Sequence, residues 1–189
     1  MTREPDSDEL ALLSPAERER TIASWRRSQQ WAREQRGHAD IQSTRPQTLA
    51  YSLTDSPVGQ LAWIAEKFKE WTDSRDRPED AVDRDQLLTN VTLYWLTGTA
   101  GSSARLCYET AHADHPQAPH GPSSAPPALA DFPRENYIPL RHRAELTNNI
   151  VQWTEYQQGG HFAAMEQPAL LVADIRRFFR HLATRRLDD

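Results

Sequence analysis

Apolar residues recur every three or four positions through much of the first half of the chain, as on the buried side of an amphipathic helix. Leu61, Ile64 and Phe68 follow this spacing, and Leu87 and Val91 repeat it farther along. Together with their start signals, these patterns predict helices over residues 15–36, 57–71 and 84–96, another beginning at Pro46, and a short one over 103–109.

The first long helix has clear start signals but few apolar positions. The run Ser14-Pro15-Ala16-Glu17 offers an N-capping hydroxyl, a proline at the first helical position and a carboxylate at the third. Ile22, Trp25 and Gln29 lie on one line among many arginines. We therefore predict a surface helix with one aromatic-bearing stripe facing inward, ended by Gly37.

The pattern changes after these helices. Prolines, alanines, serines and histidines over residues 111–131 predict an irregular linker. Residues 149–156 are rich in β-branched and aromatic side chains and predict a strand, which Gly159-Gly160 stops. An amphipathic helix follows over 168–182. A lone strand and a lone helix cannot form a stable layer, so we expect the rest of a sheet to come from elsewhere.

Composition narrows the class of protein. The chain has 189 residues and a formal net charge of −5, which is typical of one soluble domain without a basic surface for nucleic acid. No stretch approaches the roughly 18 to 20 apolar residues of a membrane span, and the N-terminus lacks the order of a signal peptide. The single Cys107 excludes an internal disulfide. We expect a cytoplasmic protein that binds neither nucleic acid nor a membrane.

One histidine is the main candidate for chemistry. His161 follows Gly159-Gly160 and precedes a predicted helix, so it would lie on a glycine-hinged turn. Imidazole changes charge near neutral pH and can serve as a general base there. A histidine after glycines is also often an ordinary loop residue, so the position alone leaves both interpretations open.

Three other histidines, His112, His115 and His120, lie close together in the proline-rich segment. Their spacing is irregular, and no set of carboxylates or cysteines accompanies them as a metal site would need. We predict neither a metal site nor any other cofactor.

Several short blocks, in order along the chain, resemble the epoxide hydrolases of the α/β-hydrolase fold, in particular the microsomal type and its bacterial relatives. The resemblance covers about Ser14–Leu182. The blocks are Ile41-Gln42-Ser43-Thr44-Arg45-Pro46-Gln47-Thr48, Asp55-Ser56-Pro57-Val58-Gly59, Glu66-Lys67-Phe68, Leu87-Leu88-Thr89-Asn90 with Tyr94-Trp95, Thr97-Gly98-Thr99, Phe132-Pro133-Arg134-Glu135 and Gly159-Gly160-His161-Phe162-Ala163-Ala164.

The resemblance implies a fragment of an α/β-hydrolase, mostly helical, with a short strand and helix from the C-terminal part of the core. On this basis we expect a disordered tail over residues 1–13 and a helical lid over 14–110. The linker over 111–131 would then lead to the core segment over 132–189. A detoxifying hydrolase is the implied role.

In enzymes of this family an aspartate attacks the epoxide to form an ester, and a histidine paired with a carboxylate activates the water that hydrolyses it. The resemblance implies that His161 is this general base and that Glu135 is the acid that orients it. Acid before histidine matches the chain order of the fold. A glutamate beside a proline is otherwise usually a solvated loop residue.

Two lid tyrosines of the family donate hydrogen bonds to the epoxide oxygen, and this chain departs from the pattern at both. His38 stands at the first position and Cys107 at the second, with Tyr108 one place later. A histidine can donate a hydrogen bond, whereas a thiol is a weak donor. Tyr108 could substitute only if its helix shifted. All three can also be read as ordinary lid residues.

The nucleophilic aspartate of the family lies upstream of the lid, and no glycine-flanked aspartate or Gly-x-Ser-x-Gly turn replaces it here. We therefore expect an N-terminally truncated hydrolase that is inactive alone. It would act on a small apolar epoxide if a separate N-terminal half complemented it, as in a split enzyme. Exposed apolar surface could also lead to self-association. The alternatives are a non-catalytic remnant or helical interaction module, and another hydrolase of the same fold, such as a dehalogenase relative.

Overall fold

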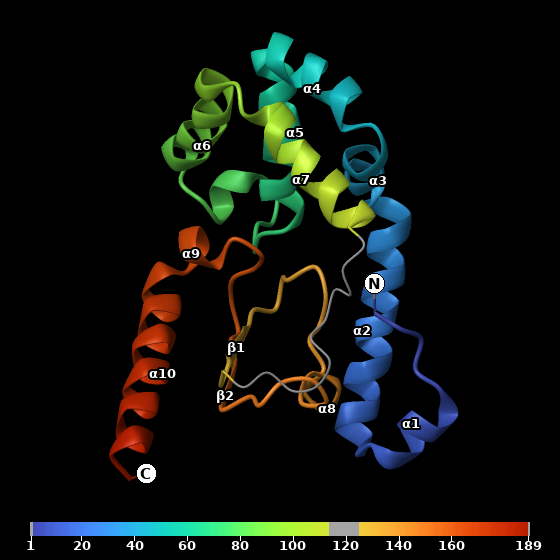
Figure 1. Ribbon diagram of the computed structural model, residues 1–189, viewed down its shortest axis with the longest axis vertical. Coiled ribbons are helices and arrows are strands. Elements are labelled where there is room, and N and C mark those ends of the chain that lie inside the picture. Colours follow the sequence, from blue (N-terminus) through green and yellow to red (C-terminus); the bar gives the residue numbers. More distant parts are fainter. Residues whose placement is uncertain (1, 114–124, 189) are drawn as a thin grey trace. The chain divides into compact units, whose positions relative to one another are not determined.

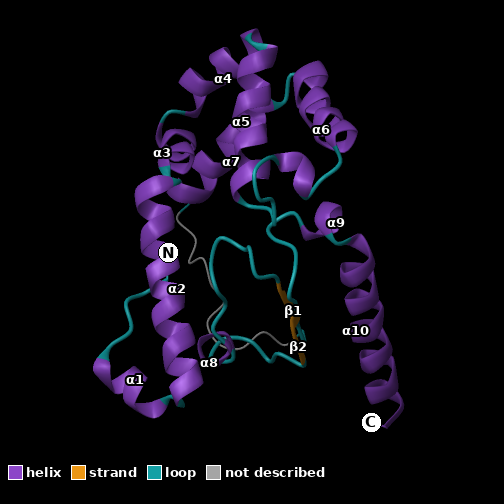
Figure 2. Ribbon diagram, turned by 180° about the vertical axis from the view of Figure 1, so that it is seen from behind, coloured by secondary structure: helices purple, strands orange, loops and turns teal. Residues whose placement is uncertain are grey.

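The computed structural model describes residues 2–113 and 125–188. These residues are mainly helical and contain one pair of short strands (Figures 1 and 2). In chain order the elements are α1 (Ser7–Leu12), α2 (Pro15–Glu34), α3 (Gly37–Thr44), α4 (Pro46–Asp55), α5 (Pro57–Glu70), the 3₁₀ helix η1 (Pro78–Asp80), α6 (Arg84–Thr97), α7 (Ala100–His112), β1 (Ala128–Asp131), α8 (Arg141–Ala144), β2 (Gln152–Glu155), α9 (Ala163–Glu166) and α10 (Pro168–Asp188).

The elements form two compact units. The first holds the described residues of Met1–Ser28, Trp71–Asp73 and Ala118–Asp189. The second holds the described residues of Gln29–Glu70 and Ser74–Gln117. This division differs from the predicted one into a tail, a lid, a linker and a core segment, because most of α2 and the three residues Trp71–Asp73 belong to the first unit.

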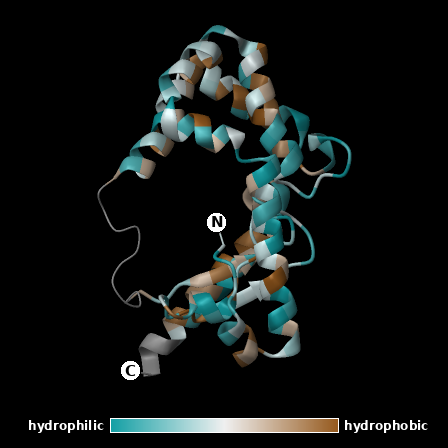
Figure 3. Ribbon diagram, turned by 90° about the vertical axis from the view of Figure 1, so that its right-hand side faces the viewer, coloured by the Kyte–Doolittle hydropathy of each residue, from teal (hydrophilic) through white to brown (hydrophobic). Residues whose placement is uncertain are grey.

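The second unit is a set of amphipathic helices. Helices α4 and α7 pack so closely that a β-carbon on Gly101 would lie 2.9 Å from the β-carbon of Ala50. Phe68 of α5 and Leu87 of α6 are buried, which confirms the apolar spacing in these helices. Figure 3 shows apolar and polar stretches alternating along the helical ribbons.

Two helix boundaries in this unit differ from those predicted. Gly37 does not simply end the first long helix; α2 ends at Glu34, and Gly37 is the first residue of α3. The short helix predicted over 103–109 is a full helix, α7. It starts soon after Gly98, which ends α6 in a left-handed conformation with φ of 63° that a residue without a β-carbon adopts at little cost.

Helix α2 begins as the sequence predicts. The Ser14 backbone N–H and hydroxyl donate to the Glu17 carboxylate at 3.0 and 2.6 Å, and the Glu17 N–H donates back to Ser14 Oγ at 3.4 Å.

The predicted inward face of α2 is wrong. Its buried side chains are Thr21, Ser24 and Ser28, whereas Ile22 and Trp25 are only half-buried. Small hydroxyl side chains let the helix approach the loop after β1, where the Ser24 hydroxyl donates to the carbonyl oxygen of Ile138 at 2.7 Å. Periodicity misses such a face, because it is polar yet satisfied by hydrogen bonds with backbone groups.

The prediction of a disordered tail over residues 1–13 is wrong for Ser7–Leu12, which forms α1. The Asp6 carboxylate caps this helix by accepting from the Glu9 N–H at 2.8 Å. Glu9 in turn accepts from the Arg143 guanidinium of α8 at 2.6 and 2.8 Å and contacts His142 Nε2 at 3.0 Å. These contacts, made by residues far apart in sequence, fasten the N-terminal segment to the first unit.

The strand predicted over 149–156 is present as β2, but it is not alone. Residues 128–131, predicted to lie in the irregular linker, form β1 and pair with β2 in parallel. The run Ala-Leu-Ala-Asp has little intrinsic preference for a strand, so the pairing itself defines β1.

Helix α10, predicted from its apolar side, is attached to β2 through a buried carboxylate. Thr154 donates to Asp174 Oδ1 at 2.9 Å, and Asp174 also pairs with Arg177. Val172, Ile175 and Phe179 of α10 are 43–62% exposed and form an apolar surface on this helix. Self-association through this surface stays a prediction.

None of the helices in the described part of the chain combines the length and the apolar character that crossing a bilayer requires.

Candidate active site

The candidate acid Glu135 and the candidate base His161 follow the two adjacent strands of the first unit, β1 and β2. Asp131 and Glu155 are partners at the ends of β1 and β2. The two segments continue side by side beyond the strands and meet again at a parallel bridge between Arg134 and Gly160. Glu135 and His161 each lie one residue past this bridge. The carboxyl ends of parallel strands are the usual place for functional groups in open α/β sheets.

The structure brings His161 and Glu135 into direct contact. Nδ1 of His161 lies 2.8 Å from Oε1 of Glu135. A carboxylate can only accept at this position, so Nδ1 carries the proton and the neutral ring keeps a lone pair on Nε2. The His161 side chain is 40% exposed and that of Glu135 is 24% exposed. Water can therefore reach the imidazole while the carboxylate stays partly shielded.

Each group of the pair favours the charged state of the other. The hydrogen bond to Glu135 raises the pKa of His161 above its ordinary value, against the opposing effect of burial. Burial alone would raise the pKa of Glu135, but hydrogen bonds from His161 and from the Asn136 N–H at 2.7 Å outweigh it and leave that pKa lowered. Such a pair holds an imidazole in one tautomer and stabilises it once it has taken up a proton.

A side chain of α2 binds the backbone around Glu135. Arg27 donates through Nη1 to the carbonyl oxygens of Pro133 at 3.0 Å and Glu135 at 3.2 Å. Burial lowers the pKa of this half-buried guanidinium. Next to it, Arg20 pairs with Asp131 and reaches Glu155 at 3.6 Å, so the ends of both strands are tied to the same helix.

The residues at the altered tyrosine positions lie in the second unit, on α3 and α7. His38 Nδ1 is 2.7 Å from the carbonyl oxygen of Gln35, and burial lowers the pKa of the ring. A neutral ring with its proton on Nδ1 has none on Nε2, so His38 is a poor donor to a ligand. The Cys107 sulfur accepts from Gln42 Nε2 at 3.1 Å. The Tyr108 ring stacks on His112 with centroids 4.1 Å apart.

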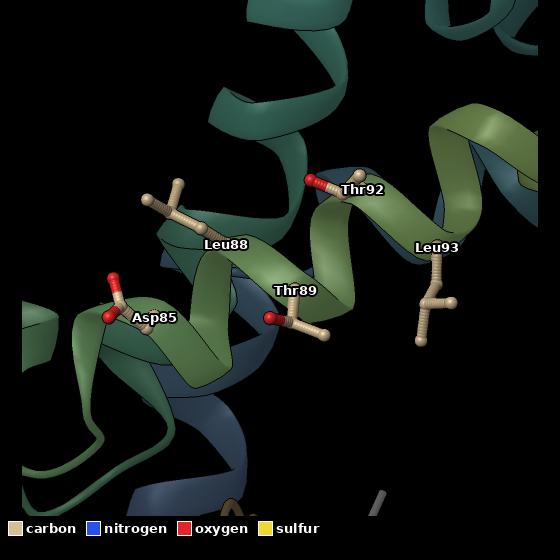
Figure 4. Close-up of a pocket in the computed structure, with 5 residues that line it drawn as sticks. All are labelled: Asp85, Leu88, Thr89, Thr92 and Leu93. Atoms are coloured by element: carbon tan, nitrogen blue, oxygen red, sulfur yellow. The ribbon is translucent and has the colours of Figure 1, made fainter.

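No group of three or more potential metal-binding side chains occurs among residues 2–113 and 125–188. His112 lies at the end of α7, and His115 and His120 lie outside the described residues. A depression of about 320 Å³ is lined by Asp85, Leu88, Thr89, Thr92 and Leu93, all from α6 (Figure 4). Its described lining offers two leucines, two threonines and one carboxylate from a single helix. This makes it a weaker candidate for an active site than the pair of His161 and Glu135.

Sequence patterns did not single out Arg27, Trp71, Asp73 or Glu166, although each contacts the segments that carry the pair. Glu166 lies five residues after His161, two residues past the end of a resembling block, and this proximity was the only signal for it. The other three are far from His161 and Glu135 in sequence, so only the fold connects them.

We compared the chain with known proteins by sequence and by structure. No family model matches the chain. The chain is 46% identical over 147 residues to the protein named "Putative epoxide hydrolase" from Stigmatella aurantiaca. The matched region covers 77% of this chain and 33% of that protein. It is 38% identical to epoxide hydrolase 1 of Sus scrofa, over 75% of this chain and 33% of the relative. The chain thus spans about a third of the length of these curated relatives.

Solved structures that resemble this chain are also epoxide hydrolases. The structure of the Aspergillus niger epoxide hydrolase superposes with a TM-score of 0.71 at 29% identity, over 94% of this chain and 42% of that one. Juvenile hormone epoxide hydrolase from the silkworm Bombyx mori gives a TM-score of 0.79 at 26% identity, over 95% and 44%. The described residues are therefore part of an α/β-hydrolase fold. Within that fold, the chain belongs to the epoxide hydrolase family and matches the C-terminal part of its members.

Proposed function

We propose that this chain supplies the water-activating part of an epoxide hydrolase site, in which an epoxide is opened to an ester on a carboxylate and the ester is hydrolysed to a vicinal diol. The observation that carries the proposal is the 2.8 Å contact between His161 Nδ1 and Glu135 Oε1, with the imidazole still accessible to water. The names of the relatives support an epoxide as the substrate.

In this mechanism Nε2 of His161 removes a proton from a water molecule as the water oxygen attacks the ester carbonyl carbon. Glu135 stabilises the imidazolium that forms and keeps its Nδ1–H in place. The bond between the carbonyl carbon and the diol oxygen then breaks, and the proton held on His161 passes to that oxygen. The products are the free diol and a carboxylic acid, which becomes the carboxylate again by giving its proton back to the group that protonated the epoxide oxygen during ring opening. No cofactor takes part.

The attacking carboxylate, in this proposal, belongs to the two thirds of the relatives that the chain does not match. It could be joined to the chain or carried by a separate one, as in a split enzyme. The carboxylates beside the pair are poor substitutes for it. Asp131 is bound to Arg20, and both oxygens of Asp73 accept hydrogen bonds, from Gly159 and Arg134.

For the hydrogen bond to the epoxide oxygen we propose Tyr108 before His38 and Cys107, on the condition that its helix shifts so that the phenol takes the place of the Cys107 side chain. His38 uses its Nδ1 proton on Gln35, and a thiol is a weak donor. The phenol of Tyr108 is the strongest donor of the three, and no described side chain or carbonyl holds its hydroxyl group. Tyr108→Phe would remove that donor and keep the ring that stacks on His112.

A chimera tests the function. This chain would replace the matching third of the Stigmatella aurantiaca relative, so that the remaining two thirds supply the proposed nucleophile. We expect the chimera to convert styrene oxide to its diol, and His161→Gln to reduce the rate by about 10²–10⁴-fold, as the loss of a general base does. Glu135→Gln should reduce it less, because the histidine remains.

His142→Gln is the matched control, since His142 lies in the same unit but contacts Glu9. It should leave the rate unchanged. A folded chimera without activity would contradict the proposal and favour the non-catalytic interpretation, in which the helices serve as an interaction module. Equal rates for His161→Gln and the unsubstituted chimera would also contradict it.

A further inference from the structure

The segment Trp71–Asp73 lies directly against the turn that carries His161, although the two are almost ninety residues apart in sequence. The backbone N–H of His161 donates to the carbonyl oxygen of Trp71 at 2.8 Å. The indole of Trp71 meets the imidazole edge to face, with centroids 5.2 Å apart, and stacks on Phe162 at 6.3 Å. Trp71–Asp73 belongs to the same compact unit as His161.

Two carboxylates close a ring of hydrogen bonds around this contact. Glu166 of α9 accepts from the Asp73 N–H at 2.8 Å through Oε2 and from the Phe162 N–H at 3.1 Å through Oε1. Asp73 accepts from the Gly159 N–H at 3.1 Å and pairs with Arg134 at 3.2 Å. The backbone is therefore held on both sides of His161.

We propose that Glu166 is a positioning residue that acts together with Asp73, which donates its N–H to Glu166 and accepts from the N–H of Gly159. Together they hold the turn 159–162 so that Nδ1 of His161 stays hydrogen-bonded to Glu135. The inference rests on the proposed function of His161 and adds residues that would set its geometry. Neither carboxylate contacts the reacting groups in this scheme. Each acts through the backbone on which the histidine is mounted.

The turn needs such support because of its glycines. Gly159 has a φ of 95°, which residues with a side chain rarely adopt, and Gly160 leaves no room for a β-carbon, so both positions require glycine. Ordering such residues costs conformational entropy, which fixed hydrogen bonds must offset. A displacement of about 1 Å at a catalytic group can cost on the order of 10²-fold in rate.

Glu166 suits this role better than a neutral side chain would. Both of its oxygens are used, each by an N–H from a different segment, and hydrogen bonds to a charged acceptor are the stronger kind. Burial raises the pKa of this carboxyl, and the hydrogen bonds that it accepts from backbone N–H groups partly counteract that rise. Glu166 also favours the protonated form of His161 through its charge, as Glu135 does more strongly. An experiment must therefore separate position from charge.

Titration of the His161 imidazole in the full chain, followed by NMR, makes that separation. Glu166→Asp keeps the charge but is one methylene too short to reach both N–H groups, whereas Glu166→Gln keeps the length and removes the charge. If Glu166 positions His161, both variants should lower the pKa of His161. If it acts by charge alone, Glu166→Asp should leave that pKa as in the unsubstituted chain, which would overturn the proposal.

The same substitution in a Glu135→Gln background tests the route of the effect. A positioning residue has nothing left to act through there, so Glu166→Asp should cause no further change. An equal shift in both backgrounds would contradict the proposal. Amide exchange gives a second readout: the N–H of Phe162 and of Asp73 should exchange about fivefold faster in Glu166→Asp, as the loss of a hydrogen bond worth about 1 kcal/mol predicts.

Asp73 provides variants that do not touch Glu166, in case Glu166→Asp fails to fold. Asp73→Asn keeps an oxygen for the Gly159 N–H and should preserve the His161 titration, whereas Asp73→Ala should lower the pKa of His161. An equal His161 pKa in the two variants would contradict the role of Asp73. None of these measurements requires turnover, so an inactive chimera would contradict the proposed function without touching this result.

Discussion

Gly160 faces the carbonyl oxygen of Trp71 so closely that a β-carbon on Gly160 would lie 2.5 Å from that oxygen. The same carbonyl accepts the N–H of His161 at 2.8 Å. The glycine therefore allows the backbone approach that places the candidate base, and the contact involves backbone atoms that cannot rotate away.

Gly160→Ala should displace the histidine turn. We expect it to lower the free energy of unfolding by about 1–3 kcal/mol, as overpacking of a closed site does, and to move the titration of His161 towards that of a free histidine. Gly37→Ala is the control, because nothing lies within 4 Å of a β-carbon built there. Its effect should stay within about 0.5 kcal/mol. Equal unfolding energies for the two variants would show that the close approach is unimportant.

Arg27→Met should loosen the loop that carries Glu135. The substitution keeps most of the apolar stem and removes the donor to the carbonyl oxygens of Pro133 and Glu135. Leaving partly buried carbonyls unsatisfied should cost about 1 kcal/mol in chemical denaturation, and the pKa of His161 should fall. Arg26→Met, at an exposed position of the same helix, should change neither quantity. A change in both variants alike would contradict the role of Arg27.

Hydrolysis by the chimera should be lost as the pH falls through the pKa of His161. The base must be neutral to accept a proton from water, and its pKa lies above the ordinary 6.5 because Glu135 stabilises the imidazolium. The acid limb of the rate profile should therefore lie above pH 6.5. Glu135→Gln removes the main cause of the raised pKa, so the limb should move to lower pH. An unchanged limb in this variant would separate Glu135 from the titrating group.

Glu9 should make the stability of the first unit sensitive to acid. Hydrogen bonds from Arg143 lower its pKa from 4.5 to about 2, against the effect of burial. A lowered carboxyl pKa contributes stability above the unfolded value of 4.5, and this contribution is lost as the pH falls towards 2.

Glu9→Gln should accordingly lower the free energy of unfolding by up to about 3 kcal/mol near neutral pH, and by little near pH 2. Thermal or denaturant unfolding across this range measures the difference. Asp8→Asn, on the exposed side of the same short helix, should have little effect at any pH. A gap between Glu9→Gln and the unsubstituted chain that persists at pH 2 would contradict the electrostatic explanation.

The sequence predicted features that depend on local chemistry. The reciprocal cap between Ser14 and Glu17 is an example, because both partners lie within one helical turn. The helices carrying Phe68 and Leu87 were predicted by apolar periodicity for the same reason. The contact between Glu135 and His161 was expected only through the family resemblance, since no local pattern connects residues on two separate segments.

Features that depend on tertiary pairing were missed. Strand β1 is a short alanine-rich run that exists because β2 lies beside it. The inner face of α2 is made of Thr21, Ser24 and Ser28, and hydrophobic patterning ranks such residues as exposed. Glu166 and Asp73 bind backbone N–H groups of other segments, and the sequence carries no mark of those acceptor roles.

The central claim is that His161 activates the water that hydrolyses an ester intermediate, and intact-protein mass spectrometry tests it most directly. The chimera would be mixed with styrene oxide and sampled over time. The unsubstituted form should release diol, with little mass added to the protein. The His161→Gln form should gain the mass of one epoxide and keep it, because the ester forms but is not hydrolysed. If His161→Gln released diol at the rate of the unsubstituted chimera and never gained mass, the account would be wrong.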